Sequence, residues 1–308
     1  MRDAFIRSLI QVAEADRRVV LMTGDLGFGV LDEYRKRFPN QFYNVGVAEQ
    51  NLAGVAAGLA LTGHVVFTYS IGNFPILRCL EQVRNDICYH EADVKIVTVG
   101  GGMAYGALGF SHFATEDLAI LRALPQMTVV APGDPIEVER LVPQIVRHRG
   151  PVYLRLGRAG EKPRHEPGVE VILGQPTRAR RGTDVLLLTT GGMLPVALQA
   201  SQDLQEDGVS AAVVSVHTLQ PLPAETLCEM AAPFPAVVTC EEHTIRGGLG
   251  GAVAEALLEG GITTAFRRFG LATPFPTGVG SQDYLRAANA LDAPALRSLV
   301  LSVAPARR

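Results

Sequence analysis

The sequence contains the stretch Asn44-Val45-Gly46-Val47-Ala48-Glu49-Gln50-Asn51, which continues as Leu52-Ala53-Gly54-Val55-Ala56-Ala57-Gly58-Leu59. Its small side chains predict a closely packed helix, and Glu49 is the carboxylate at the helix start. A glutamate in a first helical turn is ordinarily explained by its favourable interaction with the helix dipole and the free N–H groups there. Because the neighbouring residues leave little room for water, Glu49 is also a candidate for a buried functional carboxyl.

Strands and helices alternate on both sides of this segment. Short apolar runs predict strands at 19–22, 65–68, 94–99, 128–131 and 152–156, and the segments between them predict helices at 3–16, 31–38, 75–88, 116–124 and 135–149. Asp134 and Pro135 offer an N-cap and a first-turn proline for the last helix. Val94 to Val99 is largely apolar, with Lys95 and Thr98 between its valines and isoleucine, and such a run is typical of a strand covered on both faces. Residues 1–158 therefore predict one α/β domain.

A second α/β series follows a change in composition. Residues 159–181 are rich in Pro, Gly, Arg and Glu without periodicity, which predicts a linker. Beyond it, strands are predicted at 185–189, 211–216, 236–240 and 263–267, helices at 193–206, 223–231 and 252–259, and a weak helix after 276. We therefore expect an α/β protein with two doubly wound parallel-sheet domains, at 1–158 and 182–308.

The composition excludes several functional classes. The 308 residues are 47% hydrophobic and 19% charged, with a formal net charge of -3. Such a chain has no basic field for nucleic acid or an anionic membrane surface, and no apolar run reaches transmembrane length. The four cysteines lack metal-ligand spacing and fall mostly in apolar segments, as expected of reduced core thiols in the cytoplasm. We expect protein or small-molecule partners.

The segment N-V-G-V-A-E-Q-N at 44–51 resembles the one that carries the invariant glutamate of transketolase-like thiamine-diphosphate enzymes. The resemblance implies that the two domains are the pyrimidine-binding and C-terminal domains of a transketolase. It also implies that Glu49 hydrogen-bonds the ring nitrogen N1′ of the cofactor's aminopyrimidine, so that the 4′-amino group can take the proton from C2 of the thiazolium. Burial among Val and Ala would favour the protonated carboxyl that this role needs.

A second match lies at 68–74, Thr-Tyr-Ser-Ile-Gly-Asn-Phe, before the run E-Q-V-R-N at 81–85. In transketolase-like chains this region supplies aromatic rings that stack on the aminopyrimidine. Phe74 matches one such ring, and Ile71 replaces another. A single phenylalanine at a helix start is by itself more often part of the core than a cofactor platform, and the adjacent E-Q-V-R-N run favours the cofactor.

A third match is the glycine-rich loop from Gly100 to Asp117, which resembles a family loop of the form H-x-x-x-x-x-G-E-D-G-x-T-H-Q-x-x-E-D. His112 matches the second histidine, and the acidic pair follows it. Two positions depart from the family, because Gly100 stands for the first histidine and Leu108 for the aspartate that recognises a donor hydroxyl. An apolar residue there would hold a polyhydroxylated ketose phosphate less well, so the loop predicts a non-standard substrate.

Further matches concern the substrate and the fold. Arg158 stands where the family projects an arginine toward the substrate phosphate. The residue fits this role because a guanidinium can bind an oxyanion through two hydrogen bonds. An arginine leaving a sheet edge is also commonly just solvated. Asp25 matches an acid near the thiazolium ring. Residues 241–250 resemble the family's E-E-H-x-x-x-G-G-L-G run, which forms a tight turn and subunit contact, and they are only a weak dinucleotide-binding signal.

The resemblance covers the latter part of a full transketolase. The G-D-G…N motif of the pyrophosphate-binding domain, which holds Mg²⁺ and the diphosphate, has no match here. We therefore expect a partner, an N-terminal transketolase-like subunit that carries this site, in an α₂β₂ heterotetramer with thiamine diphosphate between the chains. The expected substrate is a small ketose or 2-oxo acid, with transfer of a two-carbon ketol or related acyl unit.

Two rival functions stay open at this stage. One is the β chain of a 2-oxo acid dehydrogenase, which shares the architecture and the glutamate, although the runs at 81–85 and 116–132 favour transketolase. The other is a non-catalytic scaffold subunit with the same fold, which the changes at Gly100 and Leu108 would suit. The intact Glu49 motif argues against a scaffold, although a fold alone never guarantees activity.

Overall fold

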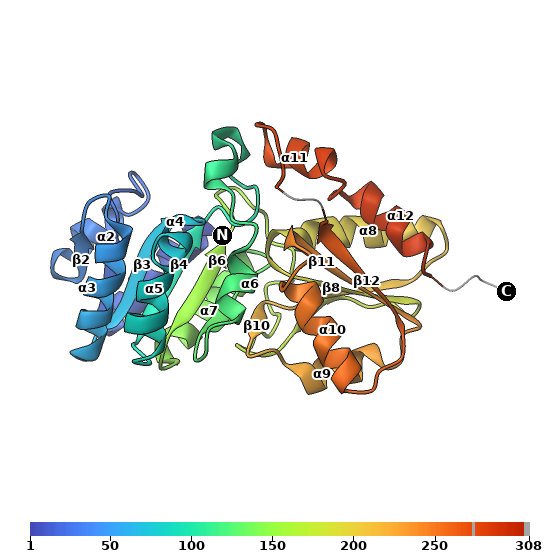
Figure 1. Ribbon diagram of the computed structural model, residues 1–308, viewed down its shortest axis with the longest axis horizontal. Helices are drawn as coiled ribbons and strands as arrows, with labels where there is room; N and C mark the ends of the chain where they lie inside the picture. Colours follow the sequence, from blue (N-terminus) through green and yellow to red (C-terminus); the bar gives the residue numbers. More distant parts are fainter. Residues whose placement is uncertain (273–274, 305–308) are drawn as a thin grey trace.

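The computed structural model describes residues 1–272 and 275–304, and it places two α/β units side by side (Figure 1). The first sheet has the strand order β10-β5-β6-β4-β3-β1-β2. All of its neighbouring strands are parallel except β10, which runs antiparallel to β5. The strands are β1 (Val19–Thr23), β2 (Phe42–Asn44), β3 (Val65–Ile71), β4 (Val94–Val99), β5 (Thr128–Val130), β6 (Val152–Leu156) and β10 (Thr218–Gln220).

The second sheet has the order β12-β11-β8-β9-β7. Its neighbours are parallel except β7, which is antiparallel to β9. Helices α8 (Leu194–Glu206), α9 (Ala224–Ala231) and α10 (Leu249–Glu259) alternate with these strands, and α11 (Gln282–Ala288) and α12 (Ala293–Leu301) follow the last one. The strands are β7 (Thr177–Arg180), β8 (Val185–Thr189), β9 (Ala211–Ser215), β11 (Ala236–Thr244) and β12 (Ala265–Leu271).

These sheets confirm the predicted α/β fold and correct it at one edge of each sheet. The antiparallel strand β7 lies within 159–181, the segment that composition assigns to a linker. In β7 only Thr177 is buried, so this edge strand has no apolar run to detect. The antiparallel strand β10 follows the second unit's β9 in sequence but joins the first unit's sheet. The two units are therefore tied by a shared strand as well as by the chain.

Helices cover both faces of the first sheet, and alternation along β1 shows how. Val19 and Leu21 point to one core cluster, with residues of α1 and α7, whereas Val20 and Met22 point to another, with residues of α3. This period of two is what a strand buried on both faces produces. The helices of this unit are α1 (Arg2–Ala15), α2 (Asp32–Arg37), α3 (Glu49–Leu61), α4 (Phe74–Leu77), α5 (Leu80–Gln82), α6 (Asp117–Arg122) and α7 (Pro135–Arg147).

The helix predicted at 75–88 is broken in the structure. The one-turn helix α4 ends at Leu77, Cys79 leaves helical geometry (φ -115°, ψ 15°), and a π-helical segment, Val83–Cys88, follows α5. The buried Cys79 thiol contacts the Phe74 carbonyl oxygen at 3.9 Å. The break gives α4 its own direction at the end of β3, independent of the helix that follows. Such π-helical segments frequently occur at functional sites.

The segment that precedes and begins α11 packs on the loop after β4, at the top of the molecule in Figure 1. The rings of Phe110 and Phe275 lie 4.7 Å apart between centroids, and the Gly280 N–H donates a hydrogen bond to the Gly106 carbonyl (3.2 Å). The second unit therefore supports the loop that carries His112. The sequence matches alone did not indicate this contact.

The N-cap predicted at Asp134 is present and makes further contacts. One carboxylate oxygen accepts from the Glu137 N–H (2.9 Å), and the other accepts from the N–H groups of Arg164 and His165 (2.7 and 2.9 Å). Because a lost cap alone costs about 0.5–2 kcal/mol, we expect Asp134→Ala to lower the free energy of unfolding by about 2 kcal/mol. Urea denaturation measures this, and an unchanged midpoint would contradict the assignment.

Candidate active site

The predicted site residues follow the carboxyl ends of parallel strands in the first sheet. Glu49 comes after β2, Asp25 after β1, and Ile71 ends β3. His112 lies in the loop after β4, and Arg158 follows β6. Because β2 and β3 flank β1 on opposite sides, the connections diverge at β1. In open α/β sheets, ligands bind at such a switch point, outside the carboxyl ends of the strands.

Glu49 is the first residue of α3 and its side chain is only 8% exposed. The preceding residue, Ala48, has no side chain that could cap the helix, so the free N–H groups of the first turn face the same region as the carboxylate. One carboxylate oxygen, Oε1, accepts a hydrogen bond from the Arg78 guanidinium Nη1 at 3.2 Å. The hollow beside Glu49 is lined mainly by apolar side chains, with Thr68 as an additional polar residue.

Phe74 and His112 lie together, and Arg78 links the Phe74 ring to this carboxylate. Their ring centroids are 5.1 Å apart with an interplanar angle of 67°, an edge-to-face contact. The Asn73 side-chain amide donates to the Ser111 carbonyl at 3.2 Å, which fixes the loop of His112 to the start of α4. The His112 Nδ1 lies 3.0 Å from the Ser111 hydroxyl oxygen. This bond leaves the other ring nitrogen of His112 available to a ligand.

The remaining predicted residues lie farther along the same edge. Asp25 adopts φ +57° and exchanges two hydrogen bonds with Asn44, each 3.0 Å long. The Arg158 backbone is anchored, because its N–H donates to the Glu161 carboxylate (2.7 Å) and its carbonyl accepts from the chain terminus. The Arg158 side chain is exposed. Glu49 begins α3, which packs over β3 and β4, and it lines a hollow with Thr68 of β3 and Ile96 of β4. Arg158 follows β6, the strand next to β4.

Arg78 is a site residue that the motif comparison missed. It contacts Glu49, and its guanidinium carbon lies 4.5 Å from the centroid of the Phe74 ring. The sequence did hold a signal, because Arg78 follows Phe74 by four residues and side chains at this spacing meet on one face of a helix. Glu49, Phe74, His112 and Arg78 thus form one contact chain.

The acidic pair after the loop has a structural role at Asp117. Its Oδ2 accepts from the Tyr153 hydroxyl (2.5 Å) and from the Arg155 Nε (2.8 Å), and all three side chains are buried. The Arg155 Nη2 also donates to the carbonyls of Ala114 (2.6 Å) and Glu242 (3.1 Å). This network fastens the end of the His112 loop to β6 and to the second unit.

The E-E-H run also proves structural. Both Glu241 carboxylate oxygens accept backbone hydrogen bonds at the start of α10, from Leu249 (2.7 Å) and Gly250 (2.8 Å). Burial raises the pKa of Glu241 to about 7, whereas burial lowers the pKa of His243 to about 4. Glu241 Oε2 and His243 Nδ1 are 3.6 Å apart. The predicted tight turn is therefore a carboxylate-capped helix start.

These pKa shifts predict opposite pH dependences. Between about pH 4.5 and 6.5 the native state holds the Glu241 proton that the unfolded chain releases, which stabilises the fold on acidification. Over the same range the unfolded chain protonates His243 and the native state does not, which destabilises it. We expect Glu241→Gln to lose up to about 3 kcal/mol more unfolding free energy than the wild type between pH 6.5 and 4.5. Parallel curves from urea denaturation would contradict this.

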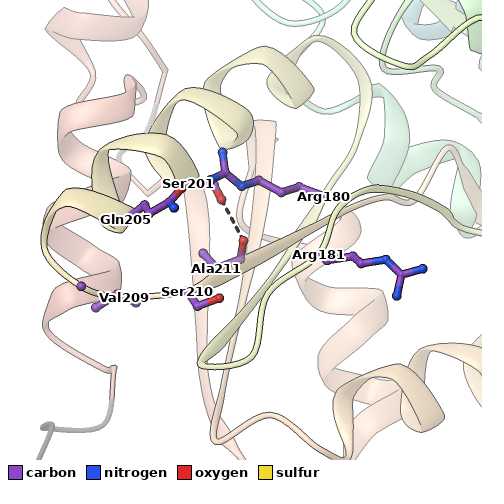
Figure 2. Close-up of a pocket in the computed structure, with 8 residues that line it drawn as sticks. Arg180, Arg181, Ser201, Gln205, Val209, Ser210 and Ala211 are labelled. Carbon is purple, nitrogen blue, oxygen red and sulfur yellow. Dashed lines mark hydrogen bonds between the residues drawn. The ribbon is translucent and has the colours of Figure 1, made fainter.

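A separate open pocket lies in the second unit, between α8 and the β7–β9 edge (Figure 2). Arg180 extends toward Ser201 and Gln205, whereas the Arg181 side chain points away from them, and the Ser201 hydroxyl donates to the Ala211 carbonyl at 2.8 Å. The Arg180 guanidinium is held by the Gln205 amide oxygen at 2.5 Å. This pocket belongs to the second unit, whereas Glu49 belongs to the first.

Within 1–272 and 275–304, no group of three or more His, Cys, Asp or Glu side chains is arranged to hold a metal ion. In the same part of the chain every helix is too short or too polar to cross a membrane. All four cysteines are free thiols.

Known protein families match both units of this chain. Residues 1–160 match the transketolase pyrimidine-binding domain and residues 174–296 match the transketolase C-terminal domain. A putative transketolase C-terminal section from Methanocaldococcus jannaschii is 38% identical, covering 88% of this chain and 86% of that protein. A 6-deoxy-6-sulfo-D-fructose transketolase subunit from Clostridium sp. (strain MSTE9) is 37% identical, covering 93% and 88%.

A solved structure described as a split-gene transketolase, inactive beta4 tetramer, superposes with a TM-score of 0.90 at 36% identity, covering 98% of this chain and 97% of that one. The carboxyl-edge site with its buried glutamate, together with these matches, defines the class of protein. The chain belongs to the transketolase family, a family of thiamine-diphosphate-dependent transferases.

Proposed function

We propose that this chain is the C-terminal subunit of a two-component transketolase-like enzyme that transfers a two-carbon ketol or related acyl unit, on a non-standard substrate. The observation that carries the proposal is the buried Glu49 carboxylate, which Arg78 links to the paired rings of Phe74 and His112. The lengths of the relatives support a separate subunit, because this chain aligns with most of the length of proteins that are themselves named as a section or a subunit.

The residues present fit the aminopyrimidine of thiamine diphosphate. Glu49 offers a hydrogen-bonding carboxyl and Phe74 offers an aromatic face for stacking, and one planar group, the Arg78 guanidinium, contacts both of them. When bound, the cofactor supplies the carbanion that attacks the donor carbonyl. Glu49 would hold a proton at the ring-nitrogen position, with Phe74 and Ile71 setting the ring plane and Asp25 near the thiazolium.

His112 and Arg158 would act on the substrate. The free ring nitrogen of His112 is suited to donate a hydrogen bond to a donor oxygen or to protonate it. Arg158, which follows the neighbouring strand β6, would hold an anionic end of the substrate through its exposed guanidinium.

We place Mg²⁺ and the diphosphate on a partner, an N-terminal transketolase-like subunit, in an α₂β₂ heterotetramer. The exposed face of α3 supports a subunit contact next to the site. Val47, just before α3, is 74% exposed, Val55 and Leu61 within the helix are also exposed, and Gly54 and Gly58 face open space. Such an apolar surface is typical of an interface. A cytoplasmic location stays a prediction, with which the four free thiols agree.

Leu108 supports the altered substrate. Leu108 lies in the turn Gly106–Leu108 on the His112 loop, and its side chain is 55% exposed. An exposed apolar side chain therefore stands at the position where the family has an aspartate. The Clostridium relative is named for a sulfo-sugar donor, which agrees with a non-standard substrate here.

We expect Leu108→Asp to raise kcat/KM for xylulose 5-phosphate about tenfold in the reconstituted pair, because an added charged hydrogen bond is worth about 1.5–3 kcal/mol. Leu108→Ala is the matched control, since it removes the apolar side chain and adds no acceptor. Pyruvate serves as the donor without the hydroxyl. Rapid wild-type turnover of xylulose 5-phosphate would defeat the altered-substrate proposal, and transfer from pyruvate to a lipoyl group would favour the dehydrogenase alternative.

A further inference from the structure

Arg78 makes two contacts at once, and both are with residues proposed to hold the cofactor ring. Its Nη1 donates to Glu49 Oε1 at 3.2 Å, and its guanidinium carbon lies 4.5 Å from the centroid of the Phe74 ring. A guanidinium is planar, donates from its edge and stacks through its face. These are the two contacts that the aminopyrimidine ring would need in the same place.

Both groups cannot use these contacts simultaneously. We propose that Arg78 is a displaceable occupant of the aminopyrimidine subsite: it neutralises Glu49 and covers Phe74 in the free chain, and it must swing out when the cofactor ring enters. This inference rests on the proposed function, because it assumes that Glu49 and Phe74 hold that ring. It assigns Arg78 as a positioning residue that acts through Glu49.

The energetics allow such an exchange. The Arg78 side chain is 54% exposed, and ion pairs with an exposed partner are worth about 0–1 kcal/mol. A cation–π contact at an exposed site adds about 0.5–1 kcal/mol. The ring can therefore displace the guanidinium at a small cost. Glu49 is buried, and a buried carboxylate without a partner is costly. In the free chain Arg78 supplies that partner.

Local structure gives Arg78 the freedom to move. It is the residue immediately after α4, a single turn, and the chain leaves helical geometry at Cys79. The Arg78 side chain therefore has one helical turn before it and no continuous helix after it. By contrast, Glu49 and Phe74 begin their helices and are each held by the adjoining packed elements. The exchange needs a rotation of one side chain and no change in the sheet.

The test uses the full chain without a partner and 4-amino-5-hydroxymethyl-2-methylpyrimidine, the pyrimidine half of the cofactor, in its neutral form. Binding is followed by changes in the NMR signals of the probe. We expect Arg78→Ala to bind it about two- to tenfold more tightly than the wild type, because the occupant is gone. Arg84→Ala is the matched control, since this exposed arginine on the next segment bonds Asn85 and not Glu49.

Salt supplies a second readout that a merely structural role would not change. Salt screens an ion pair with an exposed member, so raising the salt concentration should strengthen binding of the neutral probe to the wild type and leave Arg78→Ala unchanged. Weaker or equal binding by Arg78→Ala, or no binding by either chain, would overturn the proposal. If the reconstituted pair still bound thiamine diphosphate in those cases, the proposed function would stand without the Arg78 exchange.

Discussion

We expect the replacement of Glu49 by Ala to lower the turnover of the reconstituted pair about 10²–10⁴-fold, the usual contribution of a positioned proton-transfer group. The reason is geometric, because Glu49 is a buried carboxyl that Arg78 links to the Phe74 ring. Single-turnover kinetics measure the loss in the chemical step. Hydrogen–deuterium exchange at C2 of bound thiamine diphosphate should slow in parallel, since that exchange reports the proton transfer directly.

Two controls make this result specific. Glu81→Ala removes an exposed carboxylate from α5, and it should keep full turnover. Glu49→Gln keeps the size of the side chain but fixes it as an amide, and it should lose nearly as much activity as Glu49→Ala. A Glu49→Ala pair that assembles and turns over within a factor of about three of the wild type would remove Glu49 from the mechanism.

The second large effect concerns stability. Arg155→Met leaves Asp117 as a buried charge without its guanidinium, and breaking a buried pair in this way costs about 3–5 kcal/mol. The Ala114 and Glu242 carbonyls would also lose their donor. We therefore expect a large drop in the urea midpoint, together with a loosened His112 loop that limited proteolysis would detect.

The matched control is Arg297→Met, which breaks the exposed pair with Asp207. Exposed pairs are worth about 0–1 kcal/mol, so this variant should unfold almost as the wild type does. Equal losses of unfolding free energy from Arg155→Met and Arg297→Met would show that the buried network at Asp117 does not stabilise the fold. The expected difference between the two variants is several times the error of denaturant unfolding.

Much of the fold could be predicted because its strands are buried on both faces. Runs such as Val94 to Val99 leave a clear apolar signal, and Asp134-Pro135 marks a helix start that the structure confirms. The two antiparallel edge strands left no such signal: β7 buries only Thr177, and β10 is three residues long. Edge strands are defined by their neighbours, which local sequence does not specify.

The candidate site divides in a similar way. The family resemblance indicated Glu49, Phe74 and His112, and in the structure these residues are linked through Arg78. Arg78 was missed because the helix expected at 75–88 obscured a break at Cys79, and with it the direction of α4. The support of the His112 loop by residues near α11 was missed because it joins segments some 170 positions apart, a contact that only the tertiary fold defines.

The most direct test of the central claim is a calorimetric titration of thiamine diphosphate with Mg²⁺ into this chain alone, and then into the chain co-purified with a pyrophosphate-domain subunit. We predict tight binding only by the pair, with catalytic turnover that Glu49→Ala abolishes. A formed complex that binds no thiamine diphosphate would contradict the split-enzyme account and favour a scaffold subunit.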